Sequence, residues 1–199
     1  ILTYEMFAVP LAAFFAAVLS GLGGFGGAFL LIIVLTPIVG VKAVIPLISV
    51  FAACNNLSRV FIYRKEIVWR TAIYFTLASL PGVYFGAKLL EWMSESLLLL
   101  ILGLILIFAI PLGRKLKKTD FRSGNKTIFA FGAIYGLVSG AAAGTGMLVV
   151  AGLNSAGLRG AVLLGTDAII GFFNGAMRAG VYSFLGLLTP TMIGYALLM

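Results

Sequence analysis

Residues 20–33 read "SGLGGFGGAFLLII", a stretch in which five glycines stand between two apolar segments. The glycines are Gly21, Gly23, Gly24, Gly26 and Gly27. Glycine is the poorest helix former after proline, so this run weakens a helix inside a strongly apolar region. Two interpretations are open. The glycines form a flexible turn or a close helix-packing face, or they break a helix so that its bare backbone faces a ligand.

The composition around this stretch is that of a membrane protein. The chain has 199 residues, of which 62% are hydrophobic and 10% charged. A soluble domain usually carries about a quarter charged residues. The net charge is +8, and most of the basic residues lie in two short connections, 63–70 and 113–126. This distribution is typical of cytoplasmic loops under the positive-inside rule, so we predict no nucleic-acid partner.

The reactive residues are few. Histidine is absent and Cys54 is the only cysteine, which excludes an internal disulfide and Cys/His metal sites. We therefore predict no metal and no cofactor. We also do not expect an enzyme, because the apolar segments offer no histidine, no carboxylate pair and no Cys–His set.

Three apolar runs have about the 20 residues that a helix needs to cross a bilayer: 43–63, 67–90 and 96–113. Ahead of them, residues 5–20 and 28–39 are predicted to form two helical arms on either side of the glycine run. The second arm is too short to span comfortably at about 1.5 Å per residue. The two arms therefore form a hairpin that enters the membrane and returns, or two short crossings.

The same order restarts after residue 126. An arm at 127–141 leads into a second stretch of small residues, "SGAAAGTG" at 139–146. A short arm follows to about residue 156, then a long helix at 160–186 and the start of another helix up to residue 199. The predicted organisation is a first membrane repeat at 1–112, a basic cytoplasmic linker at 113–126 and a second repeat at 127–199. We expect the chain ends to be trimmed and the second repeat to be incomplete at its C-terminus.

A constant offset of 119 residues relates the two halves. It pairs Ser20 with Ser139, Gly21 with Gly140, Gly27 with Gly146, Asn55 with Asn174, Arg59 with Arg178, and Tyr63 with Tyr182. The motif N-x-x-x-R-x-x-x-Y recurs at the spacing set by the glycine stretches, which indicates an internal duplication.

The number of crossings predicts an inverted repeat. The first half adds three full helices to its hairpin, and three is odd, so the second half enters the membrane upside down. The expected fold is therefore all-α and polytopic, with a glycine-rich broken-helix hairpin and transmembrane helices in each repeat. Inverted repeats are common in secondary transporters, whose sites lie at the repeat interface near the bilayer midplane.

In this arrangement the two glycine-rich tips meet inside the protein. The helices that start near Ala28 and Met147 point their N-termini, with free N–H groups, at a shared cavity, which suits an anion. The expected backbone contacts to substrate come from Gly23, Gly24, Gly26, Gly27, Gly144, Thr145 and Gly146, and Thr145 adds a hydroxyl. Close helix packing by small residues remains the alternative.

Only three charged residues lie within the apolar spans: Arg59, Arg178 and Asp167. Intramembrane charges are costly and are first interpreted as functional. Asn55 and Arg59 share one helix face, as do Asn174 and Arg178, and we predict that these four side chains bind substrate. Alternatively, each arginine extends to the membrane surface. Tyr63 and Tyr182 are expected as interfacial anchors rather than ligands.

Asp167 has no acidic counterpart, because the offset leads to Ile48. It is a possible coupling group, since burial raises the pKa of a carboxylate. It could equally cap the start of a helix through "GTD" at 165–167, or pair with a basic residue.

The chain resembles the sulfite exporter TauE/SafE family of membrane permeases. The likeness lies in "SGLGGFGG" (20–27), "NNLSRVFIYRKEIVWR" (55–70), "SGAAAGTG" (139–146) and "GTD" (165–167). The resemblance implies transport of sulfur-containing or small organic anions across the bacterial plasma membrane, often outward.

The predicted function is that of a secondary transporter in the bacterial inner membrane. It would export a small anion, such as sulfite or sulfoacetate, by alternating access. The alternatives are a proton-coupled importer, a passive anion channel, an intramembrane enzyme and an assembly subunit. The expected partners are the small anion and the lipid bilayer, and the sequence leaves the oligomeric state open.

Overall fold

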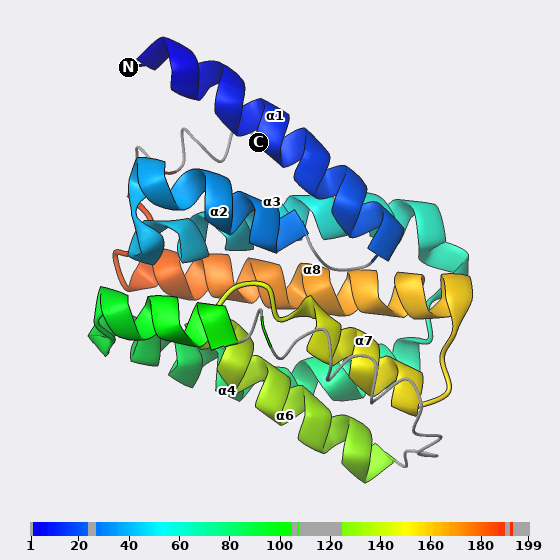
Figure 1. The fold of residues 1–199 in the computed structure, drawn as a ribbon. Helices are drawn as coiled ribbons and strands as arrows, with labels where there is room; N and C mark the ends of the chain where they lie inside the picture. The colour runs from blue at the N-terminus through cyan, green and yellow to red at the C-terminus, as the bar shows by residue number, and fades with distance from the viewer. Residues whose placement is uncertain (1, 24–26, 105–106, 108–124, 190–191, 193–199) are drawn as a thin grey trace.

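The structure, a computed structural model, describes residues 2–23, 27–104, 107, 125–189 and 192. Every secondary-structure element within these ranges is a helix, which confirms the all-α prediction (Figure 1). The first half contains α1 (Leu2–Gly23), α2 (Gly27–Val39), α3 (Val41–Tyr63), the 3-10 turn η1 (Arg64–Glu66) and α4 (Trp69–Trp92). A short apolar helix, Glu95–Leu104, follows α4.

The second half contains α6 (Asn125–Ala141), α7 (Gly146–Ser155) and α8 (Gly160–Phe184). The long helix predicted at 160–186 is α8. Helix α6 includes residues 125 and 126, the last two of the predicted linker. The rest of that linker, most of the predicted span beyond Leu104 and most of the expected C-terminal helix lie outside the described residues.

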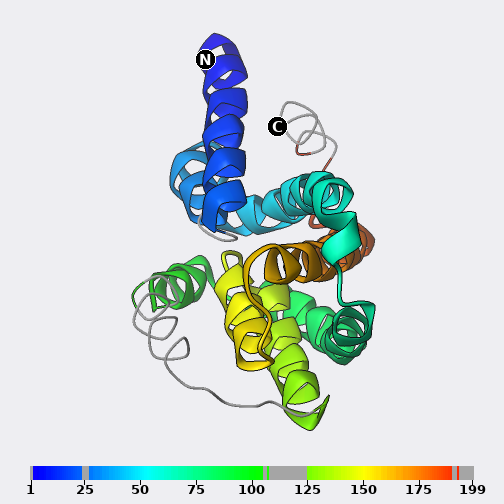
Figure 2. The same cartoon turned by 90° about the vertical axis from the view of Figure 1, so that its right-hand side faces the viewer.

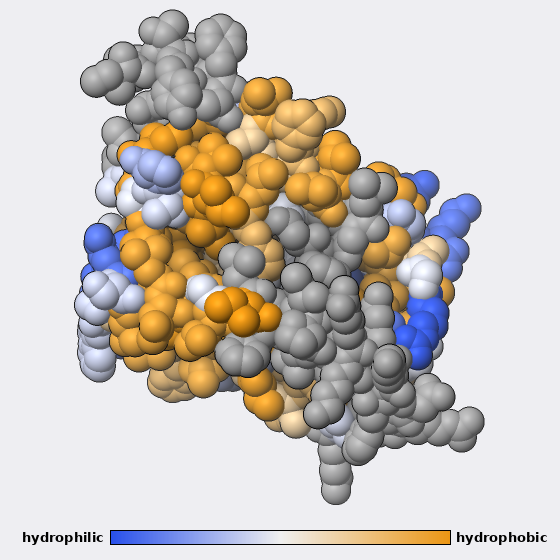
Figure 3. Space-filling model, viewed as in Figure 1, coloured by the Kyte–Doolittle hydropathy of each residue, from blue (hydrophilic) through white to orange (hydrophobic). Residues whose placement is uncertain are grey.

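Three helices of the described chain are long and apolar enough to cross a membrane: Val41–Glu66, Trp69–Trp92 and Gly160–Phe184. They correspond to the runs predicted at 43–63, 67–90 and 160–186. On the face seen in Figure 3, hydrophobic residues cover the middle, and hydrophilic residues gather at its two sides. This distribution is that of a protein that lies across a bilayer, with apolar side chains toward lipid and charges at the two surfaces.

Helix α8 is central in the bundle. Figure 2 shows it between a layer that contains α2 and α3 and a group that contains α4, α6 and α7. It runs antiparallel to α3, because Gly165 faces Tyr63 whereas Gly175 faces Ala53. It runs parallel to α4, because Val68 donates its N–H to Thr166 and Ser79 donates to Asn174, 95 residues further along the chain.

These directions place the charged residues at two opposite ends of the bundle. The start of α3 and the residues after α8 lie together, since Lys42, Glu95 and Gly186 line one hollow. The end of α3 instead lies beside the start of α8, near Gly165. The basic residues of the connection 63–70 therefore share an end with Arg159, as the charge distribution predicts.

Helices α4 and α6 pack in parallel through small residues. Gly82 and Gly86 of α4 face the glycines of α6, where a Cβ at Gly136 would overlap the carbonyl oxygen of Ser79. A Cβ at Gly140 would similarly overlap the carbonyl oxygen of Val83. Small residues at every fourth position let two membrane helices approach closely. The close-packing interpretation thus holds for Gly140, the first glycine of the stretch 139–146.

Candidate functional site

The second glycine stretch breaks the helix as predicted. Helix α6 ends at Ala141 and α7 begins at Gly146. Between them Gly144 has a φ of 81°, a left-handed conformation that side chains other than glycine rarely adopt. Thr145 occupies the N-cap position of α7 but makes no side-chain capping bond. The first turn of α7 therefore keeps N–H groups that have no partner within the helix.

The first stretch also ends a helix, although α1 continues through Gly21 to Gly23 before it does so. Gly24 and Gly26 lie outside the described residues. Helix α2 starts at Gly27, one residue from the predicted start, and α7 likewise starts one residue before Met147.

The two tips meet. The ring of Phe29, in the first turn of α2, covers Gly144 so closely that a Cβ there would lie 2.5 Å from its Cε1 atom. Gly27 and Ala28 from one tip and Gly144, Thr145 and Gly146 from the other line a single cavity of about 80 Å³. A space of about 10–15 Å³ already accommodates a water molecule, so this cavity can hold several waters or a small ion.

Three other helices complete the cavity wall. Its remaining lining residues include Ile48, Phe51, Asn55 and Asn56 from α3, Tyr135 from α6, and Asp167 and Arg178 from α8. Ile48 and Asp167 are the pair that the offset of 119 relates, and both face the cavity. Asn56 and Tyr135 were not predicted as site residues. Their sequence signals are weak: Asn56 stands one turn before Arg59, and Tyr135 is the one tyrosine in the arm 127–141.

Arg178 supplies the positive charge of the cavity wall. Its side chain is 6% exposed, and its Nη1 atom donates to the carbonyl oxygen of Ser139 at 3.1 Å. Its Nε atom is buried and has no hydrogen-bond partner among the described residues. The described residues place no carboxylate in a salt bridge with it. The guanidinium is therefore buried, with hydrogen-bonding capacity that the described residues leave unused, so the membrane-surface interpretation of Arg178 is wrong.

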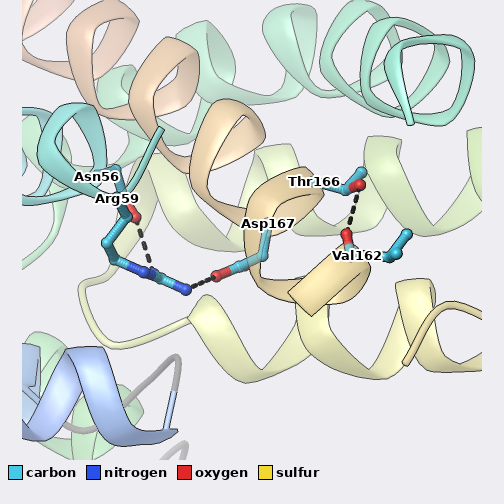
Figure 4. A network of polar contacts seen from close by, with 5 residues as sticks. All are labelled: Asn56, Arg59, Val162, Thr166 and Asp167. Carbon is cyan, nitrogen blue, oxygen red and sulfur yellow. Dashed lines mark hydrogen bonds and ion pairs between the residues drawn. The ribbon is translucent and has the colours of Figure 1, made fainter. Parts of the chain in front are cut away.

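Arg59 is also buried, but it is neutralised. Its Nη2 atom lies 3.0 Å from Oδ2 of Asp167, and its Nη1 atom donates to Oδ1 of Asn56 at 3.0 Å (Figure 4). Arg59 is 6% exposed, so its membrane-surface interpretation is wrong as well. Asp167 and Asn56 line the cavity whereas Arg59 lies behind them. Of the two predicted arginines, only Arg178 faces the cavity.

The ion pair with Arg59 bears on the three roles considered for Asp167, which are coupling group, helix cap and partner of a basic residue. It does not cap a helix start, because α8 begins at Gly160, two turns earlier. The neighbouring Thr166 donates instead to the carbonyl oxygen of Val162 at 2.8 Å, within the helix (Figure 4). Of the alternatives, the pairing of Asp167 with a basic residue is the one that the structure shows.

The two predicted asparagines have different surroundings. Asn55 lines the cavity. Asn174 is fully buried elsewhere, where its Oδ1 atom accepts from Ser79 at 2.8 Å and its Nδ2 atom donates to the carbonyl oxygen of Ile170 at 3.0 Å. It links α8 to α4, and the structure does not bring it to the cavity.

Tyr182 is not an interfacial anchor. It is fully buried, and its hydroxyl donates to the carbonyl oxygen of Gly140 at 2.6 Å. The last carbonyls of a helix lack partners within it, and Tyr182 and Arg178 satisfy two of them at the end of α6. One face of α8 thus holds the second tip in place.

The fold and the cavity together define the class of protein. The chain is a helical membrane protein whose broken helices meet at an internal cavity, where the described residues leave the charge of Arg178 without a carboxylate partner. The model of the sulfite exporter TauE/SafE family matches residues 9–199, and the chain belongs to this family.

A curated relative agrees with this membership. The chain is 33% identical over 112 residues to a protein of Cupriavidus necator named "Probable sulfite/organosulfonate exporter TauE". The aligned region covers 53% of this chain and 42% of the relative, so the chain spans less than half of that protein. No solved structure matches the chain.

Proposed function

We propose that this chain forms a multi-pass transporter of the bacterial plasma membrane that exports a small anion, either a sulfur oxyanion or an organosulfonate. The family and the printed name of the Cupriavidus necator relative support this class of substrate. The cavity supports it independently, because its lining combines a guanidinium, a hydroxyl, amides and the N-terminus of α7. Such groups bind oxyanions through charge-assisted hydrogen bonds.

The observation that carries the proposal is the difference between the two buried arginines. Asp167 balances the charge of Arg59, whereas the Nε atom of Arg178 has no hydrogen-bond partner in the described part of the chain. A buried donor without a partner costs about 1–3 kcal/mol. An anion in the cavity would supply the missing acceptor and the missing negative charge. The proposed substrate contacts are Arg178, Thr145, Asn55 and the glycines of both tips, Gly27, Gly144 and Gly146.

We further propose that residues 1–112 and 127–199 form inverted repeats, joined by a cytoplasmic linker at 113–126. Helices α3 and α8 are antiparallel counterparts under the offset, and the α1–α2 and α6–α7 hairpins contribute one tip each to the cavity. Rocking of one repeat against the other would open the cavity to each side in turn.

Export needs no coupling ion. A membrane potential that is negative inside drives an anion outward with about 2.3 kcal/mol per charge per 100 mV. Proton coupling through Asp167 has less support, because the carboxylate is already engaged in an ion pair with Arg59, which a coupled proton would have to break. An intramembrane enzyme has less support than a transporter, since the family is one of exporters.

The test is counterflow of labelled sulfite in proteoliposomes. We expect saturable exchange, and we expect Arg178→Gln to lower its initial rate about 10–100-fold, the loss of one buried charge-assisted contact. Arg178→Lys should recover part of the rate, because the charge returns without the planar fork. Lys88→Gln, which removes an exposed cation at one end of the bundle, is the matched control and should keep the full rate.

Two results would contradict the proposal. Sulfite current without exchange would indicate a channel instead of a transporter. If Arg178→Gln left the counterflow of sulfite and of every tested sulfonate unchanged, Arg178 would not belong to the site. Unfolding temperatures of each variant in detergent separate a lost contact from a lost fold.

A further inference from the structure

A groove on the outer surface, separate from the cavity, runs between α4 and α8. Its volume is about 250 Å³, and its walls include Trp69, Ile73, Leu77 and Leu80 of α4 with Ile169 and Phe173 of α8. Thr76 is the polar residue among the side chains that line it. Trp69, Ile73, Leu77 and Phe173 are each about half exposed although they are large and apolar. In a membrane protein such side chains face the acyl chains of lipid.

The groove has the length of one leaflet. It follows α4 from Trp69 to Leu80, a rise of about 16 Å at 1.5 Å per residue. Half of a hydrocarbon core of about 30 Å is about 15 Å. An acyl chain that starts at Trp69 would therefore reach the bilayer midplane where the groove ends.

The groove begins at the basic end of the bundle. Arg70 is adjacent to Trp69, and Arg64 and Lys65 lie in the preceding turn, all of them exposed. Arg159 lies at the same end, and Glu66 is the acidic residue among them. At the opposite end the described charges are mixed, with Lys42 and Lys88 against Glu91 and Glu95. Of the two ends, as far as the described residues define them, the one where the groove starts therefore attracts an anionic headgroup more strongly.

We propose that this groove is a binding site for an anionic phospholipid, with one acyl chain between α4 and α8 and the headgroup at Arg70 and Lys65. The apolar walls give shape but no selectivity, because lipid tails are as apolar as leucine. Selectivity comes from the headgroup charge at the basic cluster. A second copy of the chain is disfavoured, since a two-fold interface here would bring two basic clusters together.

The two tryptophans of the chain allow a direct test, because Trp69 lies at the groove and Trp92 at the opposite end of α4. In Trp92→Phe, Trp69 is the only tryptophan, and brominated lipids quench its fluorescence on contact. At equal mole fraction in phosphatidylcholine bilayers, brominated phosphatidylglycerol should quench Trp69 more strongly than brominated phosphatidylcholine. We expect about fivefold enrichment for each cation that contacts the headgroup. The matched control is Trp69→Phe, in which Trp92 should show no preference.

Substitution of the cations completes the test. In the Trp92→Phe background, Arg70→Gln with Lys65→Gln should abolish the preference while Trp69 stays accessible to both lipids. Equal quenching by the two lipids before substitution, or an unchanged preference after it, would overturn the proposal. Protection of Trp69 from both lipids, with Trp92 quenched normally, would overturn it in favour of a docked protein. Because the readout does not involve transport, this result is independent of the proposed export function.

Discussion

Arg59 and Asp167 form a buried ion pair that joins α3 to α8, with 3.0 Å between Nη2 and Oδ2. They are 108 residues apart in the chain, and each belongs to a different half. Asn56 holds the same guanidinium from α3, so the arginine has partners on both helices. Asp167 lines the cavity and Arg59 lies behind it, so the carboxylate separates the charge of Arg59 from the cavity.

Removal of the acid alone should be strongly destabilising. Asp167→Asn leaves a buried arginine without its counter-ion, which costs about 3–5 kcal/mol. We expect a lower unfolding temperature in detergent. The control is the double variant Arg59→Met with Asp167→Leu, which removes both charges and should be near neutral. Equal stability of Asp167→Asn and the unchanged protein would show that the pair does not hold α3 against α8.

The packing of α4 on α6 should not tolerate a methyl group at Gly136. A Cβ there overlaps the Ser79 carbonyl oxygen, which is backbone and cannot move without the whole helix. Overpacking of this kind typically costs about 1–3 kcal/mol. Gly180→Ala in α8 is the matched control, because no atom of the described residues lies within 4 Å of its Cβ position. Alanine stabilises an open helical site by up to about 1 kcal/mol, so the two variants should change the unfolding temperature in opposite directions.

Gly144→Ala should impair transport more than it impairs folding. Gly144 and Gly157 have φ values of 81° and 84°. In this left-handed conformation alanine at either position loses a similar stability, about 1–2 kcal/mol. Only at Gly144 does the new methyl group displace the Phe29 ring and separate the two tips. We expect similar unfolding temperatures for Gly144→Ala and Gly157→Ala, but slower sulfite counterflow in the first. Equal rates would mean that the contact between the tips does not shape the site.

Labelling of single cysteines should show two sides of the membrane. In a Cys54→Ala background, Lys65→Cys and a cysteine at any position in 115–124 should react with an impermeant maleimide from the cytoplasmic side. Glu95→Cys lies at the other end of the bundle and should react from outside. Reaction of Glu95→Cys and of the cysteine in 115–124 from the same side would contradict the inverted topology.

Much of the fold could be predicted from local sequence. The predicted starts near Ala28 and Met147 fall within one residue of the observed starts of α2 and α7. The reason is that glycine weakens a helix where it stands, and the apolar length of a segment decides whether it can span a bilayer. Both effects act within one segment and need no knowledge of its neighbours.

The site could be predicted only in part. The sequence singled out Arg59, Arg178 and Asp167 as the charges within apolar spans, and all three are buried near the cavity. It could not assign their different roles, because the offset of 119 makes the two arginines look equivalent. It also placed Asn174 in the site and Tyr182 at the membrane surface, whereas both are fully buried and bonded to other helices.

Taken by itself, the order of amino acids determined that this is an all-helical membrane protein with two interrupted hairpins, because helix length and helix breaks are local properties. Which arginine is neutralised and which faces the cavity was decided only when α3 and α8 packed against each other. Their antiparallel register places Asp167 beside Arg59. Arg178 instead faces the cavity and donates to the carbonyl oxygen of Ser139. Coulombic and hydrogen-bond energies depend on distances of a few ångströms between helices, and those distances exist only in the folded bundle.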